Sequence, residues 1–149
     1  MNYTKTYSGY KIIRPDGGGA FDSAHNSGFR YDLPKGRKPG AWTSKIDGDI
    51  EVCFRGYHDC TRAQMPAFVH DHQSVVLRPG YLLVAVESKS RPTDTKDKRV
   101  SAGPMRVRRV VCVLTAKKLA DYAAKRKLLY ADFAAKYNLL FWHCFRRSA

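Results

Sequence analysis

Cysteine and histidine side chains gather in the middle of the chain, where they could bind a metal ion. Cys53, His58 and Cys60 are followed by His70 and His72. The spacing Cys-x4-His-x-Cys differs from the paired Cys-x2-Cys spacing that is typical of zinc sites. A tetrahedral site would also need His70 or His72 to fold back as a fourth ligand. We therefore expect no metal here, and we expect the two cysteines to be small, buried, apolar side chains.

The same segment offers a second chemistry, because His58 stands beside Asp59 and close to Cys60. A catalytic Cys-His pair is defined by geometry, and neighbours in sequence seldom converge. We predict instead that Cys53, His58 and Cys60 stabilise a corner of the fold. Gly56 would take a backbone conformation closed to other residues, and the His58 ring can both donate and accept a hydrogen bond.

A glycine-rich stretch, PDGGGA at residues 15–20, is the one segment with some likeness to a phosphate-binding loop. It lacks the Lys-Ser/Thr pair of a P-loop and the helix opening of GxGxxG. Its composition favours a flexible turn.

Charge is the strongest signal in the sequence. The 149 residues contain 27 Lys+Arg and 13 Asp+Glu, a formal net charge of +14. Residues 1–88 have a net charge of +2 and residues 89–149 one of +12. Such an imbalance attracts polyanions. Nucleic acid is the commonest of these, because phosphate binding also releases counterions.

The candidate nucleic-acid contacts lie on a predicted strand and on a predicted helix. Simple alternation places Arg106 and Arg108 on one face of the strand and Met105 and Val107 on the other. On the helix, at 100° per residue, Lys118, Lys125 and Lys136 fall within about 20° of one another. The candidate contacts on the helix are Lys117, Lys118, Lys125 and Lys136.

The order of the expected elements indicates an α+β fold, with a compact mixed or antiparallel sheet, short helices and a long C-terminal helix. Thr61 should cap a short helix that Pro66 limits, and Thr115 should cap the long one. We expect a single domain, with an α+β core over 1–113 and a basic helix and tail over 115–149. The expected elements are strands at 9–14, 41–45, 49–54, 80–88, 99–103 and 105–114, a short helix at 61–68, and a helix from Ala116 toward Tyr137. The strands at 41–45 and 49–54 should form a hairpin around the Asp47-Gly48 turn.

Composition also suggests a cellular compartment. The N-terminal segment has no apolar core of a signal peptide, and no run approaches the ~18 apolar residues of a membrane span. We expect a cytoplasmic protein with free thiols and no membrane partner.

Part of the chain resembles an uncharacterised domain family of phage and bacterial proteins, defined by a Cys-x-x-Gly-aromatic-His-x-Cys motif. The likeness extends over roughly residues 9–113 and implies a phage or prophage setting, in the host cytoplasm, without a known activity. The residues that carry it are Gly28-Phe29-Arg30-Tyr31, Cys53-Phe54-Arg55-Gly56-Tyr57-His58-Asp59-Cys60, Leu82 to Val86, and Asp97-Lys98-Arg99-Val100.

A more remote resemblance is to the ADP-ribosyltransferase fold, through the order of Arg14, Tyr57, the helix after Thr61 and the strand GYLLVAVES. It implies NAD as a cofactor. Arg14 would bind the cofactor and Tyr57, beside His58, would stack on the nicotinamide. Either Glu87 or Asp97 would polarise the ribose.

The sequence thus leaves three functions open. The first is a non-enzymatic, phage-type accessory protein that needs no cofactor and binds nucleic acid, or a host complex containing it, through its C-terminal half. The second is an ADP-ribosyltransferase-like enzyme that uses NAD to modify a host protein or nucleic acid. The third is a protein-binding inhibitor of a host defence complex.

Overall fold

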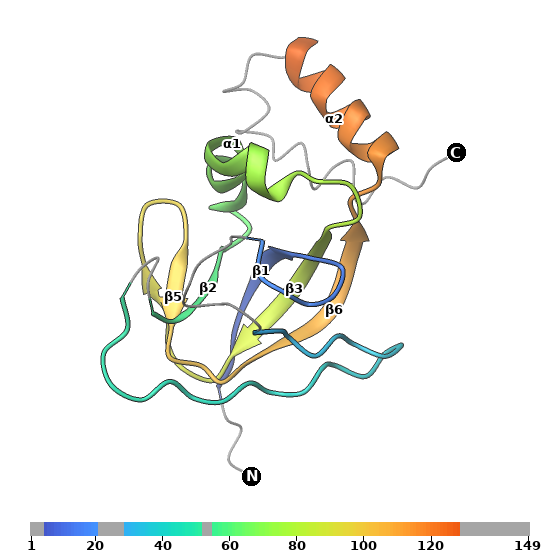
Figure 1. Ribbon diagram of the computed structural model, residues 1–149. Coiled ribbons are helices and arrows are strands. Elements are labelled where there is room, and N and C mark those ends of the chain that lie inside the picture. The colour runs from blue at the N-terminus through green and yellow to red at the C-terminus, as the bar shows by residue number, and fades with distance from the viewer. Residues whose placement is uncertain (1–4, 21–28, 52–54, 129–149) are drawn as a thin grey trace.

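The structure is a computed structural model that describes residues 5–20, 29–51 and 55–128 (Figure 1). Strands and helices both contribute, and the strands pair antiparallel, so the expected α+β class is confirmed. The strands are β1 (Tyr7–Ile13), β2 (Tyr57–Asp59), β3 (Leu82–Ser88), β4 (Thr93–Asp94), β5 (Arg99–Ser101) and β6 (Met105–Val113), and the helices are α1 (Met65–Val76) and α2 (Ala116–Leu128).

The described strands form two antiparallel sheets, one in the order β1-β3-β6 and one in the order β2-β5-β4. The two sheets are joined through the outer edge of β1. Tyr10 on β1 and Cys60, just after β2, exchange backbone hydrogen bonds of 2.7 and 2.8 Å. Ser88 at the end of β3 and Ser101 on β5 add a contact of 3.0 Å between their hydroxyl oxygens. The small sheet therefore continues from the edge of the large one.

The large sheet has a hydrophobic cluster on each face, as expected of strands whose side chains alternate. Ile12 and Leu83 face the helices, where they pack with Val69 of α1 and Tyr122 of α2. The neighbouring positions on the strands face the other way, into a cluster that includes Tyr31 and is bordered by Tyr57. The predicted core strand is confirmed. Tyr122 of α2 is buried in the cluster on the helix side, and Leu119 packs against it.

Helix α1 is longer than the sequence indicated. Thr61 and Gln64 form the reciprocal bonds of a capping box, at 3.0 and 3.1 Å, in the turn before the helix. Pro66 then lies in the first turn, where its missing N–H costs nothing. The expectation that Pro66 limits the helix was wrong for this reason, and α1 extends to Val76.

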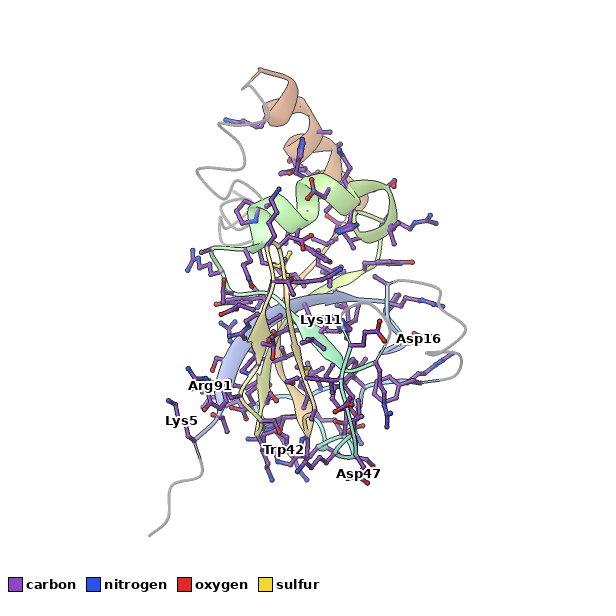
Figure 2. All side chains as sticks on the ribbon, turned by 90° about the vertical axis from the view of Figure 1, so that its left-hand side faces the viewer. Lys5, Lys11, Asp16, Trp42, Asp47 and Arg91 are labelled. Atoms are coloured by element: carbon purple, nitrogen blue, oxygen red, sulfur yellow. The ribbon has the colours of Figure 1, made fainter. Side chains whose placement is uncertain are left out.

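The strand expected at 41–45 is not formed. This segment instead lies beside β6 without becoming a regular ladder. The backbone N–H groups of Gly40 and Thr43 donate to Val107 and Met105, at 2.9 and 2.8 Å. Figure 2 shows Trp42, from this segment, at the end of the molecule away from the helices. The Asp47-Gly48 turn suggested a local hairpin, but the segment is held by long-range contacts with β6.

Helix α2 begins where the sequence predicted. The backbone N–H of Lys118 donates to the Thr115 hydroxyl at 3.2 Å, which is the bond of an N-cap. The structure describes α2 as far as Leu128, so the predicted continuation toward Tyr137, with Lys136, lies outside the described residues.

Candidate functional site

Exposed arginines lie at the middle of β6. The register pairs Arg106 with Glu87, and Arg109 with Ala85, two residues earlier on β3, while Arg108 is the extra residue of a β-bulge. Arg109 therefore lies on the same face of the sheet as Arg106. Simple alternation along the strand would have placed Arg108 there. The side chains of Arg108 and Arg109 are both exposed.

Arg106 is the most constrained of the predicted contacts. Its guanidinium donates to the Glu87 carboxylate at 2.6 Å, and the Glu87 side chain is only 8% exposed. The same guanidinium lies 4.3 Å from the ring centroid of Trp42. Arg106 thus has a structural role, because it neutralises a buried carboxylate.

The predicted lysines follow on α2. Lys117 and Lys125 are exposed, whereas Lys118 is half-buried and its ammonium donates to the Cys112 sulfur at 3.4 Å. The first turn of α2 contains no acidic residue. Cations at a helix N-terminus oppose the helix dipole, so helix stability does not explain Lys117 and Lys118. We call Arg108, Arg109, Lys117, Lys118 and Lys125 the β6–α2 surface.

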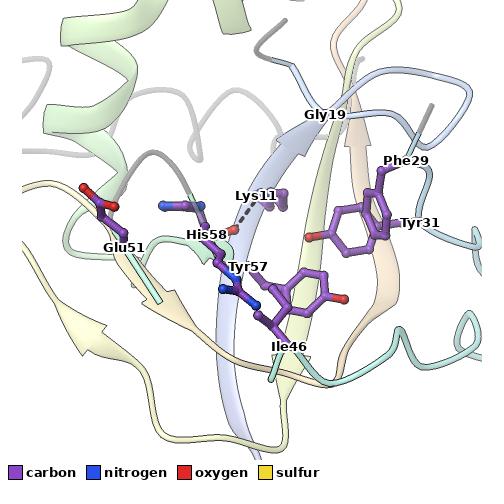
Figure 3. Close-up of a pocket in the computed structure, with 10 residues that line it drawn as sticks. Lys11, Gly19, Phe29, Tyr31, Ile46, Glu51, Tyr57 and His58 are labelled. Carbon is purple, nitrogen blue, oxygen red and sulfur yellow. Dashed lines mark hydrogen bonds between the residues drawn. The ribbon is translucent and has the colours of Figure 1, made fainter. Parts of the chain in front are cut away.

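A separate cleft of about 730 Å³ opens on the face of the large sheet away from the helices (Figure 3). Aromatic rings and cationic groups share its walls. The lining residues are Lys11, Gly19, Phe29, Tyr31, Ile46, Glu51, Arg55, Gly56, Tyr57 and His58.

Lys11 is the central cation of this cleft. It alternates with the buried Ile12 on β1, and its ammonium donates to the backbone carbonyl oxygen of His58 at 2.6 Å. It also lies 5.7 Å from the ring centroid of Tyr31. Burial lowers the pKa of Lys11, although the nearby Asp59 opposes this effect. The amine therefore lies where an anionic ligand would be favourable.

The aromatic wall is held by contacts within the protein. Phe29 meets Tyr31 edge-on at a centroid distance of 5.0 Å and lies 6.0 Å from Tyr57. The Tyr57 hydroxyl donates to the backbone oxygen of Ser44 at 2.6 Å. The Tyr57 side chain is only partly buried and lines the cleft beside the cations.

His58 and Cys60 do not have the protonation states of a nucleophilic pair. Burial, with help from Lys11 and Lys98, lowers the pKa of His58 to about 4. Burial raises the pKa of Cys60 to about 12, and its thiol lies 3.3 Å from the backbone oxygen of Asp97. At neutral pH both groups are uncharged, which disfavours nucleophilic and metal chemistry at Cys60. Cys53 lies outside the described residues.

In the part of the chain that the structure describes, no three His, Cys, Asp or Glu side chains gather in a way that would hold a metal ion. The structural role proposed for the Cys-His motif stays a prediction, because Cys53 belongs to the motif and lies outside the described residues. The positive φ expected of Gly56 is confirmed, at 143°.

The residues of the transferase resemblance are spread over the fold. Tyr57 and His58 line the cleft. Arg14 donates to the backbone oxygen of Gly19, at 2.7 Å, on the cleft wall. Glu87 shares the helix side of the sheet with Leu83 and is paired with Arg106.

Asp97, the other candidate carboxylate, pairs with His72 of α1 at 3.3 Å. The carboxylate among the lining residues is Glu51, which sequence reasoning did not select. Lys11 was also missed, although a lone lysine between Tyr10 and Ile12 of an otherwise uncharged strand was a usable signal.

Comparisons with protein families, curated proteins and solved structures find no match to this chain. The two resemblances therefore stay predictions. Within the described residues, neither helix is long and apolar enough to cross a membrane.

Proposed function

We propose that this protein is a small, non-enzymatic accessory protein that binds nucleic acid, or a complex containing it, through the β6–α2 surface. The observation that supports the proposal best is the run of mostly exposed cations from the β6 bulge into α2. From Arg108 to Lys125 there are five basic side chains, those of the β6–α2 surface, and Asp121 is the one acidic residue. Two of these cations, Lys117 and Lys118, oppose the helix dipole. A phosphate backbone would offset that cost.

The geometry suits contacts with a phosphate backbone. Arg108 and Arg109 are adjacent and exposed on an edge strand, and Lys117 follows where the strand passes into α2. Contacts of this kind give affinity and position but little sequence preference. The resemblance to the phage and bacterial family adds a phage setting to this proposal, in which the complex would belong to the host.

A binding titration tests the proposal. Fluorescent single-stranded and duplex oligonucleotides at 50 mM salt should bind, and the Arg108→Gln/Arg109→Gln variant should bind at least about tenfold more weakly. The matched control is Lys35→Gln/Lys38→Gln, which removes two exposed charges from the 32–40 loop. Equal losses of affinity in both variants would show that binding depends on the net charge of the protein and not on the β6–α2 surface. If neither oligonucleotide binds, the proposal is wrong.

The cleft favours a second function, that of an ADP-ribosyltransferase-like enzyme with a corresponding fold. Its support is the aromatic and cationic lining around Tyr57, His58 and Lys11. Against it, neither candidate carboxylate is among the lining residues of the cleft, because Glu87 pairs with Arg106 and Asp97 pairs with His72. Thermal unfolding with NAD tests it, since a ligand at 100 times its Kd stabilises a protein by about 2.7 kcal/mol. The absence of a shift at millimolar NAD would exclude it.

A protein-binding inhibitor of a host defence complex would use the same β6–α2 surface. Retention of a host partner after nuclease treatment would favour this third function over nucleic-acid binding.

A further inference from the structure

Two cations contact the ring of Trp42. The Lys89 ammonium nitrogen lies 4.5 Å and the Arg106 guanidinium carbon 4.3 Å from the ring centroid. Lys89 follows β3 directly and Arg106 lies near the start of β6, so this cluster lies at the end of the β6–α2 surface away from α2.

The backbone before and after Trp42 is bonded to β6, which holds the ring in place. The backbone N–H of Thr43 donates to the Met105 oxygen at 2.8 Å, and the Thr43 hydroxyl accepts from the Met105 N–H at 2.9 Å. Gly40 donates to Val107 at 2.9 Å. A ring fixed by its flanking backbone loses little conformational freedom on binding, which favours affinity.

The two cations differ in how firmly they are held. Arg106 is fixed between the Trp42 ring and the buried Glu87 carboxylate, 2.6 Å away. Lys89 has an exposed side chain, whose rotatable stem allows the ammonium to move. Glu87 balances one positive charge, so an anion beside the ring would be attracted by the other.

An aromatic ring flanked by cations suits single-stranded nucleic acid. Each unpaired base offers a π-face to the ring, and each nucleotide offers a phosphate to a cation. Bases in a duplex are stacked on one another and offer no free face to a side chain. Trp42 is partly exposed, and the exposed Lys89 side chain has to move away from the ring to let a base stack there.

We propose that Trp42 is a stacking platform for an unpaired base of single-stranded nucleic acid, with Lys89 binding the adjacent phosphate. The inference rests on the proposed function and specifies the form of nucleic acid. Arg106, which is held by its bond with Glu87, supports the ring. The nucleic-acid strand then continues along Arg109 toward α2.

Fluorescence tests this directly, because the chain contains two tryptophans, Trp42 and Trp142. In a Trp142→Phe variant, Trp42 is the only tryptophan that remains. Its emission should be quenched, with saturation, by a single-stranded oligonucleotide, and should change little with a duplex of the same length. Unchanged emission at saturating single strand, with binding confirmed by anisotropy, overturns the inference and leaves the proposed function intact.

Affinity supplies the second readout. Trp42→Ala should weaken single-strand binding about tenfold and duplex binding less than about twofold, while Trp42→Phe keeps much of the single-strand affinity. The control Lys45→Ala changes an exposed residue of the same segment and should leave both affinities unchanged. Equal losses for single strand and duplex would contradict stacking. A failure of every nucleic acid to bind would overturn this inference together with the proposed function.

Discussion

The carboxylate of Asp59 at the end of β2 accepts two hydrogen bonds from the guanidinium of Arg99 on β5, at 2.9 and 2.6 Å. The Asp59 side chain is 1% exposed and that of Arg99 is 11% exposed. Arg99 also donates to the backbone oxygen of Ser8, at 2.9 Å. The bidentate pair therefore joins β2 to β5 within the small sheet, and the bond to Ser8 connects Arg99 to β1.

Removing one partner of this pair should be strongly destabilising. Asp59→Asn leaves the Arg99 charge buried with a neutral partner, and we expect a loss of about 3–5 kcal/mol in the free energy of unfolding. Urea denaturation at pH 7 measures this loss. The exposed pair of Asp16 and Arg30, at 3.3 Å, provides the control, and Arg30→Gln should leave the midpoint unchanged. A small loss for Asp59→Asn would show that water reaches this pair.

Gly56 should tolerate no side chain. Its φ is 143°, and a Cβ there would lie 2.3 Å from the Val100 side chain. Backbone strain and overpacking together predict a loss of roughly 2–5 kcal/mol for Gly56→Ala, measured by urea denaturation.

Gly36 is the matched control for Gly56. Its φ is 59° and a Cβ there would have nothing within 4 Å, so Gly36→Ala should cost only about 1–2 kcal/mol of backbone strain. If the two variants lose the same stability, the contact with Val100 contributes nothing.

Local signals in the sequence predicted local features well. The apolar run from Leu82 to Val86 became the buried β3, and Thr115 became an N-cap because its hydroxyl needs only its own helix. Pro66 was misread, since whether a proline limits or begins a helix depends on which turn it occupies.

The candidate sites depended on contacts that the sequence does not display. The bulge that exchanges Arg109 for Arg108 is set by the register against β3. Trp42 lies beside Arg106 only because the Thr43 backbone bonds to β6. The cleft around Lys11 is formed by segments as distant as Phe29 and Tyr57, which no spacing in the chain reveals.

Acid should destabilise the fold in part through His58. Its pKa is about 4 in the folded protein against an ordinary 6.5, so the unfolded chain binds more protons between these values. Stability is therefore lost as the pH falls from about 6.5 toward about 4. For a fully buried group the loss between pH 7 and pH 5 would be about 2 kcal/mol, and partial exposure reduces it to the order of 1 kcal/mol.

The His58→Gln variant isolates this contribution, because the His58 carbonyl that binds Lys11 belongs to the backbone. Urea denaturation at pH 7 and pH 5 should show a smaller decrease in stability for the variant than for the wild type. His70→Gln, which changes an exposed histidine of α1, should follow the wild-type curve. Identical pH dependence in His58→Gln would contradict burial of the neutral ring.

The β6–α2 surface should give nucleic-acid binding a steep salt dependence that specific substitutions reduce. Each phosphate contact contributes about −0.7 to the slope of log K against log salt for a single strand. If Arg108 and Arg109 each neutralise one phosphate, Arg108→Gln/Arg109→Gln should reduce the slope by about 1.4, in titrations between 50 and about 200 mM salt. Arg106 is unsuitable for this test, since its removal leaves the buried Glu87 unpaired and destabilises the fold. Lys35→Gln/Lys38→Gln, with the same loss of charge on the 32–40 loop, should keep the wild-type slope. If the loop variant lowers the slope as much as the arginine variant does, the phosphates are not bound at β6.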